Sequence, residues 1–252
     1  AIVRKELYYQ PQLVAGCDKI IGAEALVCWQ HPTRGLLFPG DFIDVMEANG
    51  LIVDIGQSIL VSACQQCKAW EAEGLSTFRI AVNVSPIQFK EDNFVKLVKG
   101  ALEESGMDPN RLELEVTETL MMEEIETVAE KLQQLHILRI NVSIDDFGTG
   151  YSSLAYLKRL PIQKLKIDKT FVDNLDDDPG DLAIAEAIIN LGHSLDLDVI
   201  AEGVESEKQA DVLFAKGCDE FQGYLFSKPL SADEFAKWFS AQKTEAAKRQ
   251  SG

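Results

Sequence analysis

A unit of strand, loop and helix repeats along most of this chain, and the repetition limits the possible folds more than any other feature. Helical segments separate short apolar runs, which recur at residues 78–84, 112–117, 141–145, 163–167, 199–201 and shortly before 222–224. Strands that alternate with helices build a parallel sheet, because each helical crossover lets the next strand run in the same direction. The sequence therefore predicts an α/β fold around a parallel sheet.

The first two predicted strands, 7–14 and 20–29, break this rule. Only Ala15–Lys19 separates them, and a connection of that length is too short for a parallel crossover. The two strands should therefore pair as an antiparallel hairpin. Together with the later strands they make eight, so we expect a TIM-like (β/α)8 barrel whose first strand is antiparallel to the others.

The chain is expected to form one domain. No linker-like or low-complexity segment interrupts the pattern, so we expect a barrel over residues 1–243 and a polar, disordered tail over residues 244–252. The chain begins with Ala1 rather than Met, and we expect it to be part of a longer protein. Its five cysteines lack the spacing of a disulfide framework, which fits a reducing cytoplasm. The lone Cys64–Cys67 pair lies in a predicted helix and is interpreted as structural.

The charge of the chain limits its partners. A formal net charge of −17 makes nucleic acid polymers and anionic membranes poor partners. No run reaches the roughly 18 apolar residues of a transmembrane helix, so we expect no direct membrane contact. A cytoplasmic location is expected, either for the whole protein or for the cytoplasmic part of a larger, membrane-anchored one. An anionic small molecule can still be the substrate if divalent cations reverse the charge of the pocket.

Polar residues occupy the C-terminal ends of most predicted strands. They are Glu24, Asn83, Glu115, Asp145, Asp146, Lys166, Glu202 and Gln222. In a barrel these strand ends converge on one face, where this fold carries its active sites. Carboxylates so close together repel one another unless cations join them, and hard oxygen ligands suit Mg²⁺ or Mn²⁺ better than zinc. The pattern predicts a divalent-metal site in the barrel mouth.

Single members of this set also have simpler interpretations. Asp145 and Asp146 could form a solvated turn, and Glu115 alternates with apolar positions as a surface residue would. Repetition at successive strand ends favours the metal site over both. A barrel enzyme that uses Lys166 as the base against a metal-bound enolate is a further chemical alternative.

Several ordered motifs resemble those of the EAL-domain phosphodiesterases, which cleave the bacterial second messenger cyclic di-GMP. Glu24-Ala25-Leu26 matches the motif that names the family. The resemblance extends through residues 9–11, 83–85, 115–118, 145–154, 166–168, 202–205 and 222–224. It covers nearly the whole chain, and the order of the motifs makes it specific. The family's fold, a barrel with an antiparallel first strand, agrees with the hairpin argument.

The resemblance implies hydrolysis of cyclic di-GMP to the linear dinucleotide pGpG with two Mg²⁺ or Mn²⁺ ions. By similarity, Glu24, Asn83, Glu115 and Asp145 would bind one ion. Asp145 would be shared between the two ions, and Asp146 would bind the second. Glu202 resembles a residue that serves as a metal ligand, as the partner of one, or as the general base. Lys166 would orient the water or neutralise charge in the transition state. Lys166, Glu202 and Asp146 are therefore the expected catalytic residues.

The resemblance also implies contacts to the nucleotide and to a nearby loop. The expected substrate-binding residues are Gln10, Leu26, Asp41, Glu205 and Gln222, of which the first and third resemble guanine contacts. Glu118 has two interpretations: a carboxylate favoured by a helix N-terminus, or, as in the family, a tether for the loop after Asp146. The sequence leaves both open.

One position departs from the family pattern. An arginine that meets a substrate phosphate commonly follows the Glu-Ala-Leu motif by two residues, and Cys28 occupies this position. A thiol cannot replace a charged, bidentate donor. Loss of one charge-assisted contact is worth roughly 1.5–3 kcal/mol, so we expect a weak KM rather than inactivity.

A catalytically idle receptor that binds cyclic di-GMP and signals through its conformation is the alternative from a different class. Idle members usually lack metal carboxylates or the loop motif, and this chain has both, which favours the enzyme. The loop after Asp146 and the predicted helix 151–160 resemble the family's dimer-coupled region. The resemblance therefore also implies a homodimer, with regulatory or sensory domains upstream.

Overall fold

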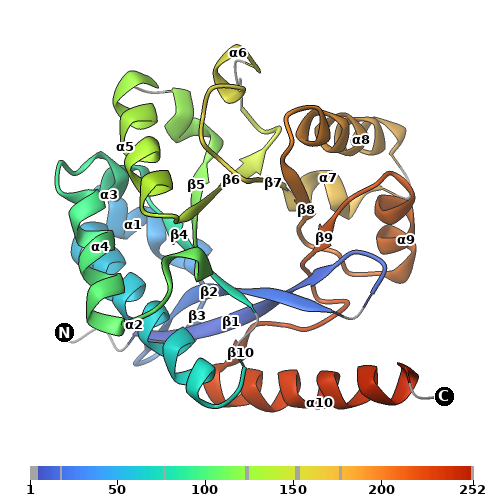
Figure 1. Cartoon of the computed structure of the whole chain (residues 1–252), viewed down its shortest axis with the longest axis horizontal. Helices are drawn as coiled ribbons and strands as arrows, with labels where there is room; N and C mark the ends of the chain where they lie inside the picture. The colour runs from blue at the N-terminus through green and yellow to red at the C-terminus, as the bar shows by residue number, and fades with distance from the viewer. Residues whose placement is uncertain are drawn as a thin grey trace.

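The computed structural model describes residues 5–17, 19–75, 78–122, 125–150, 154–175 and 178–250. Eight strands close into a barrel with helices around it (Figure 1). Around the barrel they are β1 (Lys5–Val14), β2 (Ile20–His31), β4 (Arg79–Val84), β5 (Leu112–Thr117), β6 (Asn141–Phe147), β7 (Lys164–Ile167), β8 (Asp198–Ala201) and β9 (Glu220–Phe221). β1 pairs antiparallel with β2 and β9, and the other neighbours in the ring pair in parallel. The predicted TIM-like barrel with a reversed first strand is confirmed.

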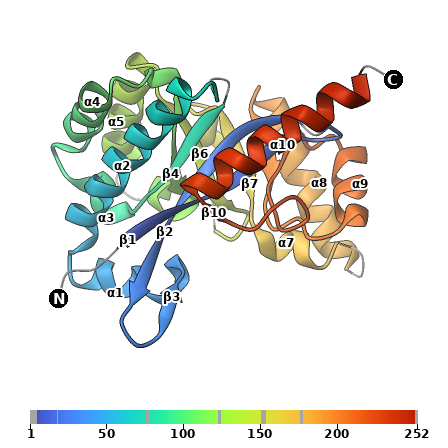
Figure 2. The same cartoon turned by 90° about the horizontal axis from the view of Figure 1, so that it is seen from below.

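Two short strands outside the barrel were not predicted. β3 (Gly35–Leu37) pairs with the end of β2, and the resulting hairpin projects from the body in Figure 2. β10 (Leu230–Ser231) pairs with β1. Both are too short for an alternating pattern to develop, so periodicity could not reveal them.

The outer layer consists of helices. They are η1 (Pro39–Asp41), α1 (Ile43–Ala48), α2 (Ile52–Ala72), α3 (Pro86–Lys90), α4 (Phe94–Ser105), η2 (Pro109–Arg111), η3 (Glu118–Met122), α5 (Ile125–Ile137), α6 (Leu154–Leu157), α7 (Lys169–Asp173), α8 (Pro179–Ser194), α9 (Glu207–Ala215) and α10 (Ala232–Gln250). α4 ends at Gly106, whose φ of 66° is a left-handed conformation that favours glycine. None of the helices in the described ranges combines the length and apolar character needed to cross a bilayer.

Two helical segments are short. Residues 39–48 form η1 and α1, with a break at Phe42. The helix expected over 151–160 is reduced to α6, and its first three predicted residues, 151–153, lie outside the described residues. Pro161 follows closely, and a proline disfavours helical backbone at the residue before it, so the helix ends early.

The last helix is longer than predicted. α10 continues through residues 244–250, where the sequence predicts a disordered tail. Residues 245–250 are glutamate, alanine, lysine, arginine and glutamine, which have high helix propensity and can extend a helix that packing has already started. Phe235 and Phe239 of α10 are buried, and the Phe235 ring stacks on Trp70 at 4.8 Å. α10 thereby lies across β1 (Figure 2).

The main apolar core lies between the barrel and its helices. Leu114, Leu165 and Val199 point outward from their strands and are completely buried. Helix α8 comes so close that a Cβ on Gly192 would lie 2.4 Å from a methyl carbon of Val199. Because the apolar strand residues face outward, the alternate positions face the inside of the barrel.

Candidate active site

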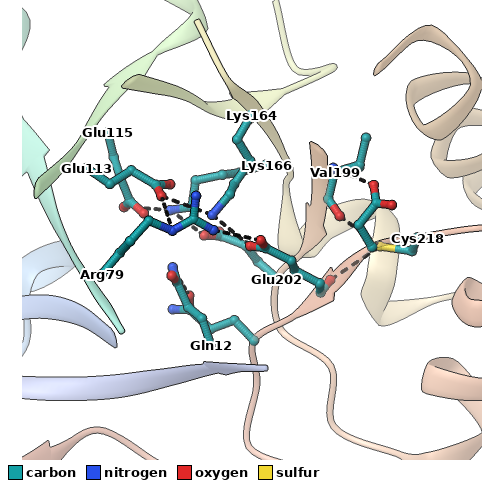
Figure 3. A network of polar contacts seen from close by, with 12 residues as sticks. Gln12, Arg79, Glu113, Glu115, Lys164, Lys166, Val199, Glu202 and Cys218 are labelled. Atoms are coloured by element: carbon teal, nitrogen blue, oxygen red, sulfur yellow. Dashed lines mark hydrogen bonds and ion pairs between the residues drawn. The ribbon is translucent and has the colours of Figure 1, made fainter. Parts of the chain in front are cut away.

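The inside of this barrel carries polar side chains rather than the branched apolar residues that usually fill it. They form two clusters, and Figure 3 shows members of both, among them Glu115 and Lys166 of one and Glu113 and Lys164 of the other. The mouth cluster consists of Glu24, Asn83, Glu115, Asp145, Lys166, Glu202 and Gln222. The lower cluster consists of Arg79, Glu113, Lys164 and Glu220. The structure thus brings the predicted metal-ligating strand ends together.

Lys166 lies at the centre of the mouth cluster. Its Nζ is 2.6 Å from Glu115 Oε2, 3.1 Å from Asp145 Oδ1 and 2.5 Å from Glu202 Oε1. The side chains of Lys166 and Glu115 are buried, and that of Glu202 is 19% exposed. One ammonium group therefore faces three carboxylates, and Glu24 adds a fourth negative charge nearby.

This imbalance shifts the pKa values of the cluster. Burial raises the pKa of Glu115 well above its usual value, and Lys166 only partly offsets it. Burial likewise raises the pKa of Glu202 to about 8 against the pull of Lys166, with Asp145 adding to the rise. Burial lowers the pKa of Lys166, but the surrounding carboxylates outweigh it and the pKa lies well above the usual value. The mouth therefore contains more negative charge than its own lysine balances.

Two amides orient Glu24. Asn83 Nδ2 donates to Glu24 Oε1 at 2.5 Å, and Gln222 Nε2 donates to Glu24 Oε2. Gln222 Oε1 in turn accepts from Gln12 Nε2 at 3.0 Å. Gly22 makes room for this side chain, because a Cβ there would lie 2.5 Å from Gln12 Oε1. Asn83, Gln222 and Gln12 thus fix one carboxylate.

The adjacent carboxylates Asp145 and Asp146 have different neighbours. Asp145 faces Lys166, whereas Asp146 has a φ of 53°, unusual outside glycine, and shares a hydrogen bond with Asp168. Burial, followed by the charges of Asp145 and Asp168, raises the pKa of Asp146 to about 6. These contacts do not fit a simple solvated turn. They also place Asp168, which begins α7, beside the site.

Glu118 holds the loop that follows this pair. Its Oε2 accepts from the backbone N–H groups of Gly148 at 2.9 Å and Gly150 at 3.2 Å, and the residue is 2% exposed. Gly148 has a φ of 101°, a conformation that other residues rarely adopt. Of the two interpretations of Glu118, these hydrogen bonds to the loop support the tether.

The residues predicted to bind a nucleotide lie at two depths. Gln10 is buried in the mouth, where its Oε1 accepts from Gln222 Nε2 at 3.2 Å. Leu26 is two residues beyond Glu24 on the same face of β2 and is half-buried. These side chains extend the mouth cluster along the first two strands.

The other two predicted contacts are more exposed. Asp41 accepts from the backbone N–H of Phe38 at 3.1 Å and so stabilises η1. Glu205 pairs with Lys169 Nζ at 2.7 Å, and both side chains are about half exposed. Their roles toward a nucleotide stay predictions.

Cys28, which occupies the expected arginine position, is completely buried. It lies opposite Glu6 in the β1–β2 register. Burial, followed by the charge of Glu6, raises the pKa of the thiol to about 11. An arginine at this position would have to displace packed neighbours to reach the mouth.

The donor set of the mouth fits a hard divalent cation. Carboxylate and amide oxygens are the preferred ligands of Mg²⁺ and Mn²⁺. Glu115 Oε1 is buried and has no hydrogen-bond partner in the described part of the chain, so one ligand atom is available. As the side chains lie, no three His, Cys, Asp or Glu groups within the described ranges surround a metal position. Their oxygens converge on Lys166 instead, so cation binding requires some of them to turn away from its ammonium group.

The lower cluster was not predicted from the sequence. Lys164 Nζ lies 3.0 Å from Glu113 Oε2 and 2.7 Å from Glu220 Oε2, and Arg79 Nη2 lies 2.8 Å from Glu220 Oε1. Burial raises the pKa of Glu113, but Lys164 and Arg79 outweigh it and hold the pKa below its usual value. A sequence signal existed, because Glu113 and Lys164 share the strand face of Glu115 and Lys166, two residues away.

Fold and site together define a TIM-like barrel protein with a carboxylate-rich mouth at the C-terminal ends of its parallel strands. The model of the EAL domain family matches residues 4–229, so this chain belongs to the EAL domain family, as its motifs predicted.

Two curated relatives from Pseudomonas aeruginosa show the same family. The bifunctional diguanylate cyclase/cyclic di-GMP phosphodiesterase MucR is 44% identical over 93% of this chain and 34% of its own length. The cyclic di-GMP phosphodiesterase NbdA is 42% identical over 96% of this chain and 31% of its own length. The chain thus spans about a third of the length of these relatives.

Solved structures agree. The PaMucR phosphodiesterase in complex with c-di-GMP has a TM-score of 0.90 and 44% identity, covering 92% of this chain and 94% of that one. The EAL enzyme Bd1971, with cAMP and cyclic di-GMP bound, has a TM-score of 0.88 and 36% identity, covering 92% of this chain and 64% of that one.

Proposed function

We propose that this domain hydrolyses cyclic di-GMP to linear pGpG in a reaction that depends on divalent cations. The observation that carries the proposal is the mouth cluster, where three carboxylates contact one ammonium group and Glu24, bound by Asn83, adds a fourth negative charge nearby. Such a mouth can receive a phosphodiester only if cations first reverse its charge. The names of MucR, NbdA and the PaMucR complex support the substrate.

The donor positions suggest how the ions would be held. Asp146 would hold one of two Mg²⁺ or Mn²⁺ ions, and the other ion would be held by Glu24, Asn83, Glu115 and Asp145. When bound, such ions polarise a phosphoryl oxygen and make water a better nucleophile at neutral pH. Asn83 keeps its amide oxygen available, because its Nδ2 is the atom that donates to Glu24. These side chains would otherwise repel one another and the substrate.

Glu202 and Lys166 would move and neutralise charge. Water attacks one phosphorus of the ring, its proton passes to a base, and one phosphorus–oxygen ester bond breaks with protonation of the leaving oxygen. Burial raises the pKa of Glu202 to about 8 in the metal-free mouth. Bound cations would lower this pKa, and the ionised carboxylate could then accept the proton of the water as a general base. Lys166 Nζ donates to the carboxylates around it and can instead donate to the extra negative charge of the transition state.

The direct test is to incubate the purified domain with cyclic di-GMP and Mg²⁺ or Mn²⁺ and separate the products by chromatography. We expect pGpG to form, and chelation of the metal to stop its formation. An Asp145→Asn variant provides a matched control that keeps the side chain's shape. Tight binding of cyclic di-GMP without any pGpG would support the idle receptor instead.

The wider setting of the domain is also proposed. Relatives three times as long support regulatory or sensory domains in the same protein and, with the five free cysteines, a cytoplasmic site of action. A homodimer through the loop after Asp146 is proposed from the family resemblance. Sedimentation that shows only monomers at high micromolar concentration would contradict it.

A further inference from the structure

Lys164 has no part in the proposed chemistry, yet it is among the most deeply buried charges of the barrel. Its side chain is 1% exposed, and its Nζ lies between carboxylate oxygens of Glu113 and Glu220 at 3.0 Å and 2.7 Å. Burying charges in this way costs free energy that ion pairs return only in part. Stabilisation alone is therefore a weak explanation for this cluster.

The lower cluster repeats the strand pattern of the mouth cluster. Its residues on β5 and β7 and at the start of β9 are each two positions before a mouth residue, which is Glu115, Lys166 or Gln222. Two residues along a strand are one step of about 7 Å on the same face. Glu113, Lys164 and Glu220 thus each lie one such step before a mouth residue in the chain.

Side chains in the lumen, not the backbone ladder, connect these strands directly. β6 separates β5 from β7, and β8 separates β7 from β9. Backbone hydrogen bonds join only neighbouring strands, whereas side chains from alternate strands meet in layers inside such a barrel. The ion pairs of Lys164 with Glu113 and Glu220 are contacts of this second kind.

We propose that Lys164 is a positioning residue for the mouth cluster. Lys164 joins β5, β7 and β9 two residues before the mouth residues. It thereby fixes the distance between Lys166 Nζ and Glu115 Oε2, which is 2.6 Å. It also fixes β9 so that Gln222 donates to Glu24. The expected effect on kcat rests on the proposed function, but the positioning of Lys166 and Gln222 by Lys164 does not.

Two variants test this role. Lys164→Met removes the charge and keeps the length of the side chain. Glu113→Gln is milder, since Lys164 keeps Glu220 as its partner, and it decides the question if the first variant does not fold. Arg111→Met is the matched control, because Arg111 pairs with Glu71 at 3.2 Å and binds backbone carbonyl groups instead of the mouth residues.

Three measurements are compared: the crystal structure of each variant, its Kd for Mn²⁺ by calorimetry, and its kcat and KM for cyclic di-GMP. In Lys164→Met and Glu113→Gln we expect a displaced Lys166, Mn²⁺ affinity weaker by about tenfold to a hundredfold, and kcat lower by about tenfold or more with little change in KM. In Arg111→Met we expect a lower Tm and an unchanged Kd for Mn²⁺.

The inference is overturned if folded Glu113→Gln keeps Lys166 in place and binds Mn²⁺ with wild-type affinity. It is equally overturned if Arg111→Met weakens Mn²⁺ binding as much as the lower-cluster variants do. A wild-type domain that forms no pGpG would reject the proposed function alone. In that case the crystal structures and the Mn²⁺ affinities still decide whether Lys164 positions the mouth.

Discussion

Two clusters of charged side chains lie inside one barrel, and they differ in charge balance. The lower cluster has as many cations as carboxylates, whereas the mouth cluster has more carboxylates than cations. In the lower cluster two cations face two carboxylates; they hold the pKa of Glu113 below its usual value despite burial, whereas burial still raises the pKa of Glu220. In the mouth cluster Lys166 alone faces the carboxylates, and burial raises the pKa of Glu115 and Glu202. A balanced cluster is electrostatically complete, whereas the unbalanced one requires cations from outside.

The largest effect should follow from removing one mouth carboxylate. Asp145→Asn keeps the shape of the side chain but removes a charge that lies 3.1 Å from Lys166 Nζ. We expect pGpG formation to fall by about a hundredfold or more. The Tm of the metal-free protein should stay constant or rise, because the excess negative charge is reduced. A clear drop in Tm by calorimetry would show that the mouth is not overcharged.

Removing a cation from the lower cluster should act on stability first. Lys164→Met leaves Glu113 and Glu220 buried with Arg79 as their remaining cation, so the free energy of unfolding should fall by about 3–5 kcal/mol. Urea unfolding measures this change. As a control, Lys216→Met removes an ion pair with Glu186 that is about one-third exposed, and it should change stability by less than about 1 kcal/mol.

The pH dependence of stability should reflect the raised pKa values of the buried carboxylates. The folded-state pKa values of Glu202, about 8, and Asp146, about 6, are raised by burial, so the folded metal-free protein binds more protons than the unfolded chain. Stability should therefore decrease as the pH rises from about 5 to about 8. In the lower cluster the raised pKa of Glu220 acts in the same direction. The depressed pKa of Glu113 acts oppositely, and the stability that Glu113 contributes is lost only as the pH falls below the usual glutamate range.

Thermal unfolding with and without Mg²⁺ tests this expectation. Bound cations should lower the pKa of the mouth carboxylates, so the stabilisation by Mg²⁺ should be larger at pH 8 than at pH 6. A Tm of the metal-free protein that rises steadily from pH 5 to pH 8 would contradict the imbalance of the mouth.

A smaller effect is expected at the loop beside the mouth. Glu118→Ala removes the acceptor of the N–H groups of Gly148 and Gly150, contacts worth roughly 1.5–3 kcal/mol. We expect faster hydrogen exchange at these amides and pGpG formation reduced by about tenfold. Glu118→Gln keeps one acceptor oxygen, so its pGpG formation should fall by less than that of Glu118→Ala. Unchanged exchange in Glu118→Ala would refute the tether.

The smallest effect concerns substrate affinity rather than either cluster. Cys28→Arg should lower KM by about tenfold if the arginine reaches a substrate phosphate. Because Cys28 is completely buried, the same variant should have a lower Tm. Cys28→Ala, which changes little volume and adds no charge, should leave KM unchanged. An unchanged KM in folded Cys28→Arg would reject the phosphate contact.

Much of this molecule could be predicted because its signals are local. The short Ala15–Lys19 connection requires a hairpin, and the strand–helix rhythm requires a parallel barrel, which the structure shows. Strand ends converge in any such barrel, so the mouth carboxylates could be grouped from their positions alone. The disordered tail stays a prediction: α10 runs through residues 244–250, and residues 251–252 lie outside the described part of the chain.

Alternation along β5 and β7 shows that Glu113 shares a face with Glu115, and Lys164 with Lys166, and the sequence determines that much by itself. Only the tertiary structure decides which face is the lumen and which charges meet there. The partners of Lys164 come from strands about 50 residues away on either side, and their pairing depends on the closure of the barrel. Charge balance is a property of side chains in contact, and contacts across a closed barrel exist only after the chain has folded.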